Sequence, residues 1–122
     1  MVIEDLYRYR VNKSEEGLID ATITINKEHA LYGGHFPGFP VTPGVCQVLM
    51  VQEILERELN SPLILSGARQ IKFTAVHEPD REKEVELEIS FKREDKKLKV
   101  TACLYKEAKV FLKFKGEFSK RK

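Results

Sequence analysis

The sequence GGHFPGFPVTPGV, which runs from Gly33 to Val45, determines how the rest of the chain is interpreted. It places four glycines and three prolines within thirteen residues, around a single histidine, His35. Because proline fixes φ and glycine permits backbone conformations closed to other residues, this stretch predicts a shaped loop. Thr42 followed by Pro43 is typical of a helix N-cap and first helical position, so the loop is expected to lead directly into a helix.

The helix is predicted from Pro43 to about Leu59, with apolar residues around nearly its whole circumference. A helix of this kind is typically buried on all sides. Its charged last turn and the Asn-Ser-Pro sequence at 60–62 predict where it ends. His35 lies just before this helix, whose first N–H groups can stabilise a developing negative charge, so the loop is a candidate chemical site.

Alternating apolar and polar residues predict the remaining elements. They indicate strands at residues 6–12, 18–26, 63–75, 84–92, 98–104 and 110–118, joined mostly by short turns. One long helix with about six such strands predicts an α+β fold in which an antiparallel sheet wraps around the helix. At 122 residues, without repeats or linkers, the chain is expected to be a single domain spanning residues 1–122.

Composition excludes several classes of protein. An apolar fraction of 42% and a charged fraction of 33% are typical of a soluble globular protein, and a net charge of +2 gives no indication of nucleic-acid binding. Without a long apolar run or a signal-peptide pattern, we expect a cytoplasmic protein. Cys46 and Cys103 are expected to be core thiols, and His29 and His77 exposed turn residues. No metal-ligand spacing occurs, so neither a metal nor a cofactor is predicted.

The loop and helix also resemble the signature of the 3-hydroxyacyl-acyl-carrier-protein dehydratases of bacterial fatty-acid synthesis, which have the hot-dog fold. GHFPG at 34–38, Pro40 and PGV at 43–45 agree with that family's GHFPGxPxxPGV run. The order of predicted elements agrees as well. The resemblance implies a hot-dog domain that forms a homodimer, or a higher assembly of dimers, by edge-to-edge sheet pairing, with active sites at the dimer interface.

The resemblance also implies residue roles in the dehydration of an acyl thioester held on acyl carrier protein. His35 would remove the proton beside the thioester carbonyl, and the Gly44 N–H would bind the carbonyl oxygen. Phe36 and Phe39 either line the acyl tunnel or pack under the loop. The implied substrate-binding residues are Phe36, Gly38, Phe39, Gly44 and Val45. Elementary chemistry agrees, since a neutral histidine is a suitable base and helix N–H groups stabilise an enolate.

The sequence departs from the family pattern at the catalytic acid. The family's helix carboxylate corresponds to Leu49, which cannot donate a proton. Glu53, about one turn or 6 Å further along the helix, either replaces it or forms an i,i+4 ion pair with Arg57. Alternatively, a second dehydratase-like subunit supplies the carboxylate, or the chain is an acyl thioesterase or a non-catalytic binder of acyl carrier protein.

Other polar residues have two interpretations each. Gln47 and Gln52 either bind substrate or water, or bond to neighbouring backbone. Four cationic residues are expected either to contact an acidic carrier protein or simply to be solvated on a strand face: Arg8, Arg10, Arg69 and Lys72.

Overall fold

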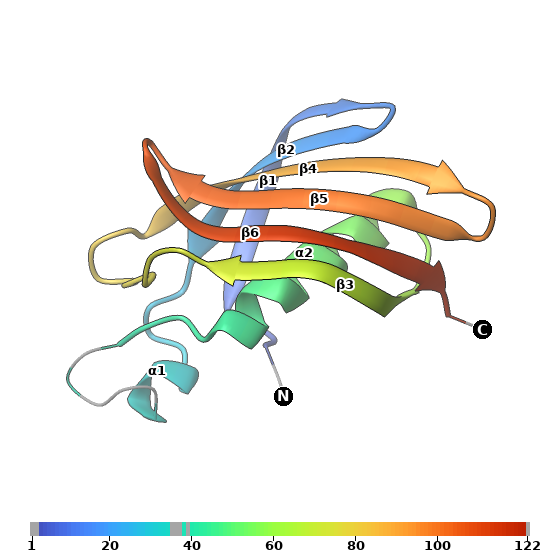
Figure 1. Cartoon of the computed structure of the whole chain (residues 1–122). Helices are drawn as coiled ribbons and strands as arrows, with labels where there is room; N and C mark the ends of the chain where they lie inside the picture. The colour runs from blue at the N-terminus through green and yellow to red at the C-terminus, as the bar shows by residue number, and fades with distance from the viewer. Residues whose placement is uncertain (1–2, 35–37, 39, 122) are drawn as a thin grey trace.

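A computed structural model of the chain, which describes residues 3–34, 38 and 40–121, consists of one antiparallel sheet curved over a long helix (Figure 1). The elements in chain order are β1 (Tyr7–Glu15), β2 (Leu18–Ile25), α1 (Leu31–Gly34), α2 (Gly44–Leu59), β3 (Leu63–Phe73), β4 (Glu84–Glu94), β5 (Lys97–Lys106) and β6 (Lys109–Lys120). The predicted α+β fold with six strands around one long helix is confirmed. The short helix α1 lies where the sequence predicted only loop.

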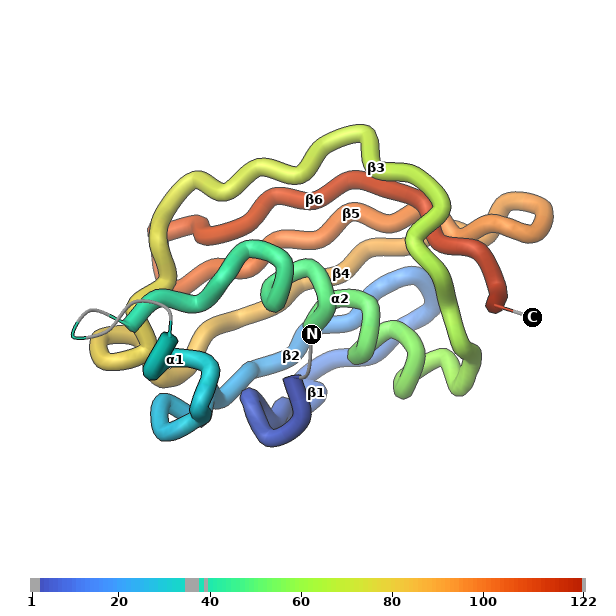
Figure 2. The backbone as a smooth tube through the Cα atoms, turned by 90° about the horizontal axis from the view of Figure 1, so that it is seen from below, coloured from blue at the N-terminus to red at the C-terminus, as the bar shows by residue number. Residues whose placement is uncertain are grey.

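The strands follow the order β1-β2-β4-β5-β6-β3, and every neighbouring pair is antiparallel. Tight hairpins join β1 to β2, β4 to β5 and β5 to β6, whereas β3 crosses to the far edge beside β6. Helix α2 lies across the concave face of this sheet (Figure 2). Consequently β1 and β3 are the two edge strands.

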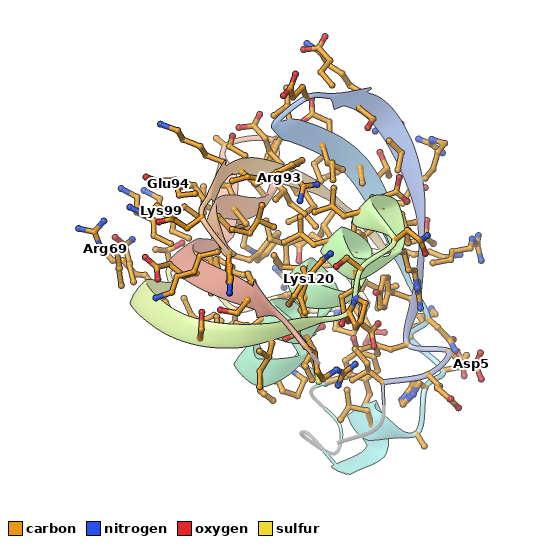
Figure 3. All side chains as sticks on the ribbon, turned by 90° about the vertical axis from the view of Figure 1, so that its right-hand side faces the viewer. Asp5, Arg69, Arg93, Glu94, Lys99 and Lys120 are labelled. Carbon is orange, nitrogen blue, oxygen red and sulfur yellow. The ribbon has the colours of Figure 1, made fainter. Side chains whose placement is uncertain are left out.

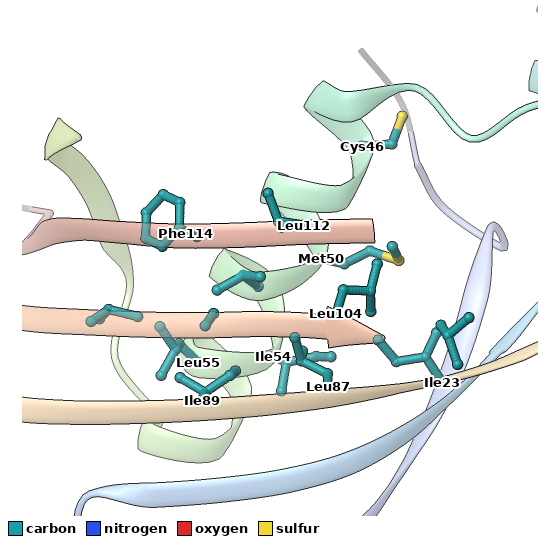
Figure 4. Packing of buried hydrophobic residues seen from close by; sticks show 14 of the residues in the cluster. Ile23, Cys46, Met50, Ile54, Leu55, Leu87, Ile89, Leu104, Leu112 and Phe114 are labelled. Carbon is teal, nitrogen blue, oxygen red and sulfur yellow. The ribbon is translucent and has the colours of Figure 1, made fainter. Parts of the chain in front are cut away.

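The core lies between α2 and the concave face of the sheet. Along β4, β5 and β6, alternate residues point toward the helix and are buried, as the period-2 pattern predicts. Figure 4 shows the helix residues Met50, Ile54 and Leu55 among residues of β4, β5 and β6. The largest fully buried side chains are Phe111, Phe114, Phe118, Leu6, Ile19, Ile23, Ile25, Met50, Ile54, Leu55, Leu87 and Ile89.

The prediction that α2 is buried on all sides is wrong for the single chain. Its buried residues form one face, because only one sheet is available to cover it: Cys46, Gln47, Met50, Val51, Ile54 and Leu55. Val45 on the open side is 51% exposed, and Val48 and Leu49 are half-buried. The predicted end is confirmed, since Asn60 closes the helix in a left-handed conformation with φ of 48°.

Edge strand β3 carries apolar residues that the described part of the chain does not cover. Ile64 is 51% exposed, Ile71 41% and Phe73 48%, and Val76 just beyond the strand is 56% exposed. Two irregularities interrupt its pairing with β6, between Leu65 and Gly67 and between Ala68 and Gln70. This edge therefore combines exposed apolar surface with a kinked backbone.

The convex face of the sheet carries mainly charged residues. Figure 3 shows Arg69, Glu94 and Lys99 together on the outside of the sheet, and Lys99 forms an ion pair with Glu94 at 3.0 Å. Cys103 is half-buried on this face, since its neighbours Ala102 and Leu104 are the residues that point inward. The expectation of a core thiol is therefore confirmed for Cys46 and wrong for Cys103.

Gly116 of β6 lies where a side chain would collide with β3. A Cβ atom there would lie 2.7 Å from the Gly67 carbonyl oxygen and 2.7 Å from the Phe114 ring, whereas a Cβ at Gly67 would meet no atom of the described residues within 4 Å. We expect Gly116→Ala to lower the free energy of unfolding by about 1–3 kcal/mol through overpacking. Urea denaturation beside the matched control Gly67→Ala checks this, and equal effects of the two variants would contradict it.

Candidate functional site

The candidate site is built on the start of α2. The helix begins at Gly44, and Pro43 takes the cap position with φ of −59° and ψ of 144°. The prediction of Thr42 as side-chain cap and Pro43 as first helical residue is therefore wrong by one position, because the Thr42 hydroxyl has other partners. Helix geometry leaves the N–H groups of the first turn without acceptors in a preceding turn. The Gly44 N–H is thus available for an electron-rich group.

Phe73, at the end of β3, lies over this helix start. A Cβ atom on Gly44 would lie 2.5, 2.7 and 2.9 Å from three atoms of the Phe73 ring. The ring is itself 48% exposed, so it packs against Gly44 on one side and faces solvent on the other. The absence of a side chain at Gly44 therefore lets an aromatic ring sit against the N-terminus of α2.

A buried chain of hydrogen bonds fixes the residue that precedes the helix. The Thr42 hydroxyl lies 2.8 Å from the Tyr32 hydroxyl and 2.6 Å from Nδ1 of His77, and His77 Nε2 lies 2.8 Å from the Glu82 carbonyl oxygen. The prediction of His77 as an exposed turn residue is wrong: it is 2% exposed and packs edge-on against Phe111. The polar sequence around it gave no periodic signal of burial.

Both helix glutamines bond to backbone carbonyls. Gln47 Nε2 donates to the Thr42 carbonyl at 3.3 Å, and Gln52 Nε2 donates to the Leu63 carbonyl at 3.0 Å. Gln47 is 3% exposed, and its Oε1 atom is buried without a hydrogen-bond partner among the described residues. These contacts favour the backbone-bonded interpretation of the two residues and add a further tie between α2 and Thr42.

Glu53 is held by β1 and by its own helix. Its Oε1 atom accepts a hydrogen bond of 2.8 Å from the Tyr7 hydroxyl, and it lies 3.9 Å from Arg57 Nη2. Burial, together with the hydrogen bond to Glu53, raises the pKa of the Tyr7 hydroxyl. The i,i+4 contact predicted with Arg57 is thus present, and Tyr7 is a partner that sequence spacing did not indicate. At the family's acid position, Leu49 is a half-buried apolar residue.

Three of the predicted site residues, His35, Phe36 and Phe39, lie outside the described residues. Gly38 is exposed, with φ of 80°, in the left-handed region that favours glycine. Val45 is exposed beside Gly44 in the first turn of α2. The structure therefore brings together Gly44, Val45 and the buried Thr42 network at the end of the predicted loop.

The described residues offer neither a metal site nor a membrane-spanning helix. Within residues 3–34, 38 and 40–121, no three His, Cys, Asp or Glu side chains lie close enough together to hold a metal ion. In the same part of the chain, no helix has both the length and the apolar composition needed to cross a membrane.

Comparison with solved structures places this architecture in the hot-dog fold class. A chain of the dehydratase heterocomplex ApeI:P from Xenorhabdus doucetiae superposes with a TM-score of 0.73 and 18% identity, over 90% of this chain and 94% of its own. An uncharacterised protein from Erwinia carotovora subsp. atroseptica has a TM-score of 0.64 and 19% identity, over 93% and 92%. A Bacillus halodurans protein solved with CoA has a TM-score of 0.58 and 12% identity, over 93% and 74%.

Sequence comparison gives the family. The family model described as ApeI-like, ApeI dehydratase, matches residues 11–115. The chain therefore belongs to the ApeI-like dehydratase family, which confirms the hot-dog dehydratase resemblance of the loop and helix. No curated protein matches the sequence.

The contact between Gly44 and Phe73 leads to a stability prediction. In a Phe73→Ala background, Gly44→Ala should gain up to about 1 kcal/mol from helix propensity. With Phe73 present, the ring must first move, so the same substitution should be neutral or destabilising. We expect a coupling of about 1 kcal/mol in a double-mutant cycle measured by chemical denaturation. Additive effects would show that the ring does not restrict this position.

Burial of His77 leads to a pH prediction. Burial lowers the pKa of His77 below its ordinary value of 6.5. The hydrogen bond to the Glu82 backbone raises the pKa, but by less than burial lowers it. Below about pH 6.5 the unfolded chain therefore binds this proton more readily, and stability falls with decreasing pH until the folded pKa is passed. We expect the stability advantage of the wild type over His77→Asn to shrink between pH 7.5 and 5.5 in thermal denaturation. A constant difference would contradict it.

Proposed function

We propose that this chain is a 3-hydroxyacyl-acyl-carrier-protein dehydratase, a hydro-lyase that yields a trans-2-enoyl thioester in fatty-acid or related lipid synthesis in the cytoplasm. The observation that carries the proposal is the helix start at Gly44, six residues after the end of the GHFPG sequence, in a chain of a dehydratase family. The Bacillus halodurans protein, which has the same fold, was solved with CoA, a molecule that forms thioesters, and this supports a thioester substrate.

In the proposed reaction, His35 takes the proton from C2 of the substrate while the thioester carbonyl becomes enolate-like. The Gly44 N–H stabilises the developing negative charge on the carbonyl oxygen, which is the usual effect of a helix N-terminus. The C3 hydroxyl then leaves as water after receiving a proton, and the C2–C3 double bond forms. Phe36, Gly38, Phe39 and Val45 are proposed to line the path of the acyl chain.

The source of the proton for the leaving hydroxyl has two candidates. Glu53 is the nearest helix carboxyl group to the family position in sequence, but it already accepts the Tyr7 hydroxyl and lies near Arg57. Those contacts favour the alternative that a second dehydratase-like chain supplies the acid, with this chain binding the acyl carrier substrate. The Xenorhabdus doucetiae dehydratase is a heterocomplex, which is consistent with that alternative. An acyl thioesterase that has lost dehydration is the remaining alternative.

The proposed partner surface is the β3 edge together with the open face of α2. Ile71, Phe73 and Val45 leave apolar area there, and β3 is an edge strand of the described sheet. Pairing of two sheets at this edge would cover these residues and bring a second chain to the start of α2. The partner is either a copy of this chain or a second dehydratase-like subunit.

A pair of variants separates the two roles of Glu53. Glu53→Gln removes the carboxyl group, whereas Tyr7→Phe removes only its hydrogen-bond donor. If Glu53 is the acid, we expect Glu53→Gln to lower turnover by about 100-fold or more, with Tyr7→Phe close to wild type. If Glu53 is structural, both variants should cost about 1 kcal/mol of stability and leave turnover unchanged.

The assay measures dehydration of a 3-hydroxyacyl-carrier substrate by the purified chain, alone and with a second dehydratase-like chain. His35→Ala should abolish turnover in either setting, since no other group in the proposal removes the C2 proton. Full activity of His35→Ala, or hydrolysis of the thioester without dehydration, would contradict the proposed function. Activity that appears only with the second chain would identify that chain as the source of the acid.

A further inference from the structure

A buried polar network beside the start of α2 has no direct role in the proposed chemistry. Tyr32, Thr42 and His77 are 4%, 5% and 2% exposed, and they join three separate parts of the chain. Tyr32 lies in α1, Thr42 just before α2, and His77 in the connection between β3 and β4. Because burial keeps competing water away from these hydrogen bonds, the network holds the three segments in one arrangement.

The donor and acceptor roles in this network are fixed by chemistry. The Glu82 carbonyl oxygen can only accept, so His77 must carry its proton on Nε2, at 2.8 Å from that oxygen. Nδ1 of a neutral His77 is then an acceptor, and the Thr42 hydroxyl donates to it across 2.6 Å. The Thr42 oxygen in turn accepts from the Tyr32 hydroxyl at 2.8 Å. With neutral His77, each donor in the network therefore faces an acceptor.

The main chain of Thr42 is held by the same neighbours. Its N–H donates to the His77 carbonyl at 2.9 Å, and its carbonyl accepts from Gln47 Nε2 at 3.3 Å. The next residue, Pro43, has a restricted φ, so little freedom remains before Gly44. Fixing Thr42 thus fixes the position of the Gly44 N–H. The bond between Tyr32 and Thr42 also ties together the two ends of the loop, which are 10 residues apart.

We infer that Tyr32 and His77 are positioning residues for the dehydration reaction, acting through Thr42 on the Gly44 N–H that binds the thioester carbonyl. This inference rests on the proposed function for its catalytic consequence. A shift of about 1 Å in a transition-state contact is enough to cost about 100-fold in rate, so loss of one contact in this network is expected to lower turnover.

The surroundings of His77 support a neutral ring. Phe111 packs against its edge with ring centroids 5.1 Å apart. The charged groups near it are Glu78, Glu82 and Lys109, and Lys109 pairs with Glu82 at 3.0 Å. Burial, aided by the positive charge of Lys109, lowers the pKa of His77 more than the Glu82 backbone contact and the carboxylates of Glu82 and Glu78 raise it. Protonation of Nδ1 would turn this acceptor into a donor, so the Thr42 hydroxyl would have to reverse and donate to the Tyr32 oxygen.

The test uses variants that keep or remove one contact each. Thr42→Val removes the hydroxyl at nearly constant shape, and Thr42→Ser restores it. At His77, asparagine retains an acceptor near the Nδ1 position, whereas glutamine retains only a donor toward the Glu82 carbonyl. Thr101→Val, at an exposed threonine of β5, is the matched control. All are assayed with the full chain, with a second dehydratase-like chain present, at a temperature where thermal denaturation shows each variant folded.

We expect Thr42→Val and His77→Gln to lower kcat about 10- to 100-fold with KM changed less than about 3-fold, since the contact acts in the transition state. Thr42→Ser and His77→Asn should recover to within about 3-fold of wild type. Nitrogen-15 NMR should show the Nε2–H form of His77 in the wild type, and the Gly44 amide signal should move in the two impaired variants and return in the two restored ones.

An unchanged kcat in Thr42→Val and His77→Gln would overturn the inference, as would a lowered kcat with an unmoved Gly44 amide signal. The NMR measurement needs no substrate. If the wild type shows no dehydration with either partner arrangement, the proposed function fails, and the positioning of Gly44 is then decided by the amide signal alone: movement in the impaired variants supports it and no movement overturns it.

Discussion

The structure depends on a single helix packing one face against the concave side of a six-stranded sheet. Met50, Ile54 and Leu55 make that contact, and the alternating inward residues of β4, β5 and β6 complete it. At about 25 cal/mol per Å² of apolar area, burial of these side chains is the main term that favours folding. Because the sheet covers only one side of α2, the other side of the helix stays open. The β3 edge of the sheet is open as well.

The sequence predicted the repetitive parts of this architecture because each has a periodic signal. Val85, Leu87 and Ile89 alternate with polar residues, and a half-buried strand requires that alternation. The burial of α2 on all sides was predicted wrongly, because a helix wheel reports apolar residues and not how many layers cover them. Membership of the ApeI-like dehydratase family agrees with the motif that resembles the dehydratase signature.

The supporting residues of the site were beyond sequence reasoning. His77 and Thr42 are 35 residues apart, and no spacing rule connects a turn histidine with a residue before a helix. Tyr7 and Glu53 meet across 46 residues for the same reason. The first contact arises where the connection from β3 to β4 returns to the start of α2, and the second where β1 packs beside α2, and tertiary packing decides both. The motif thus predicted a chemistry, whereas the structure was needed to find the contacts that hold the start of α2 in place.

The kinks in β3 have a consequence for self-association. An open strand with exposed Ile71 and Phe73 is a template on which further strands can stack without limit. Two interruptions of regular pairing, near Gly67 and Gln70, and the cations Arg69 and Lys72 work against such stacking. An incoming strand has to match an irregular, charged edge, which a flat amyloid-prone segment cannot do. These features therefore oppose unlimited addition of strands at this edge.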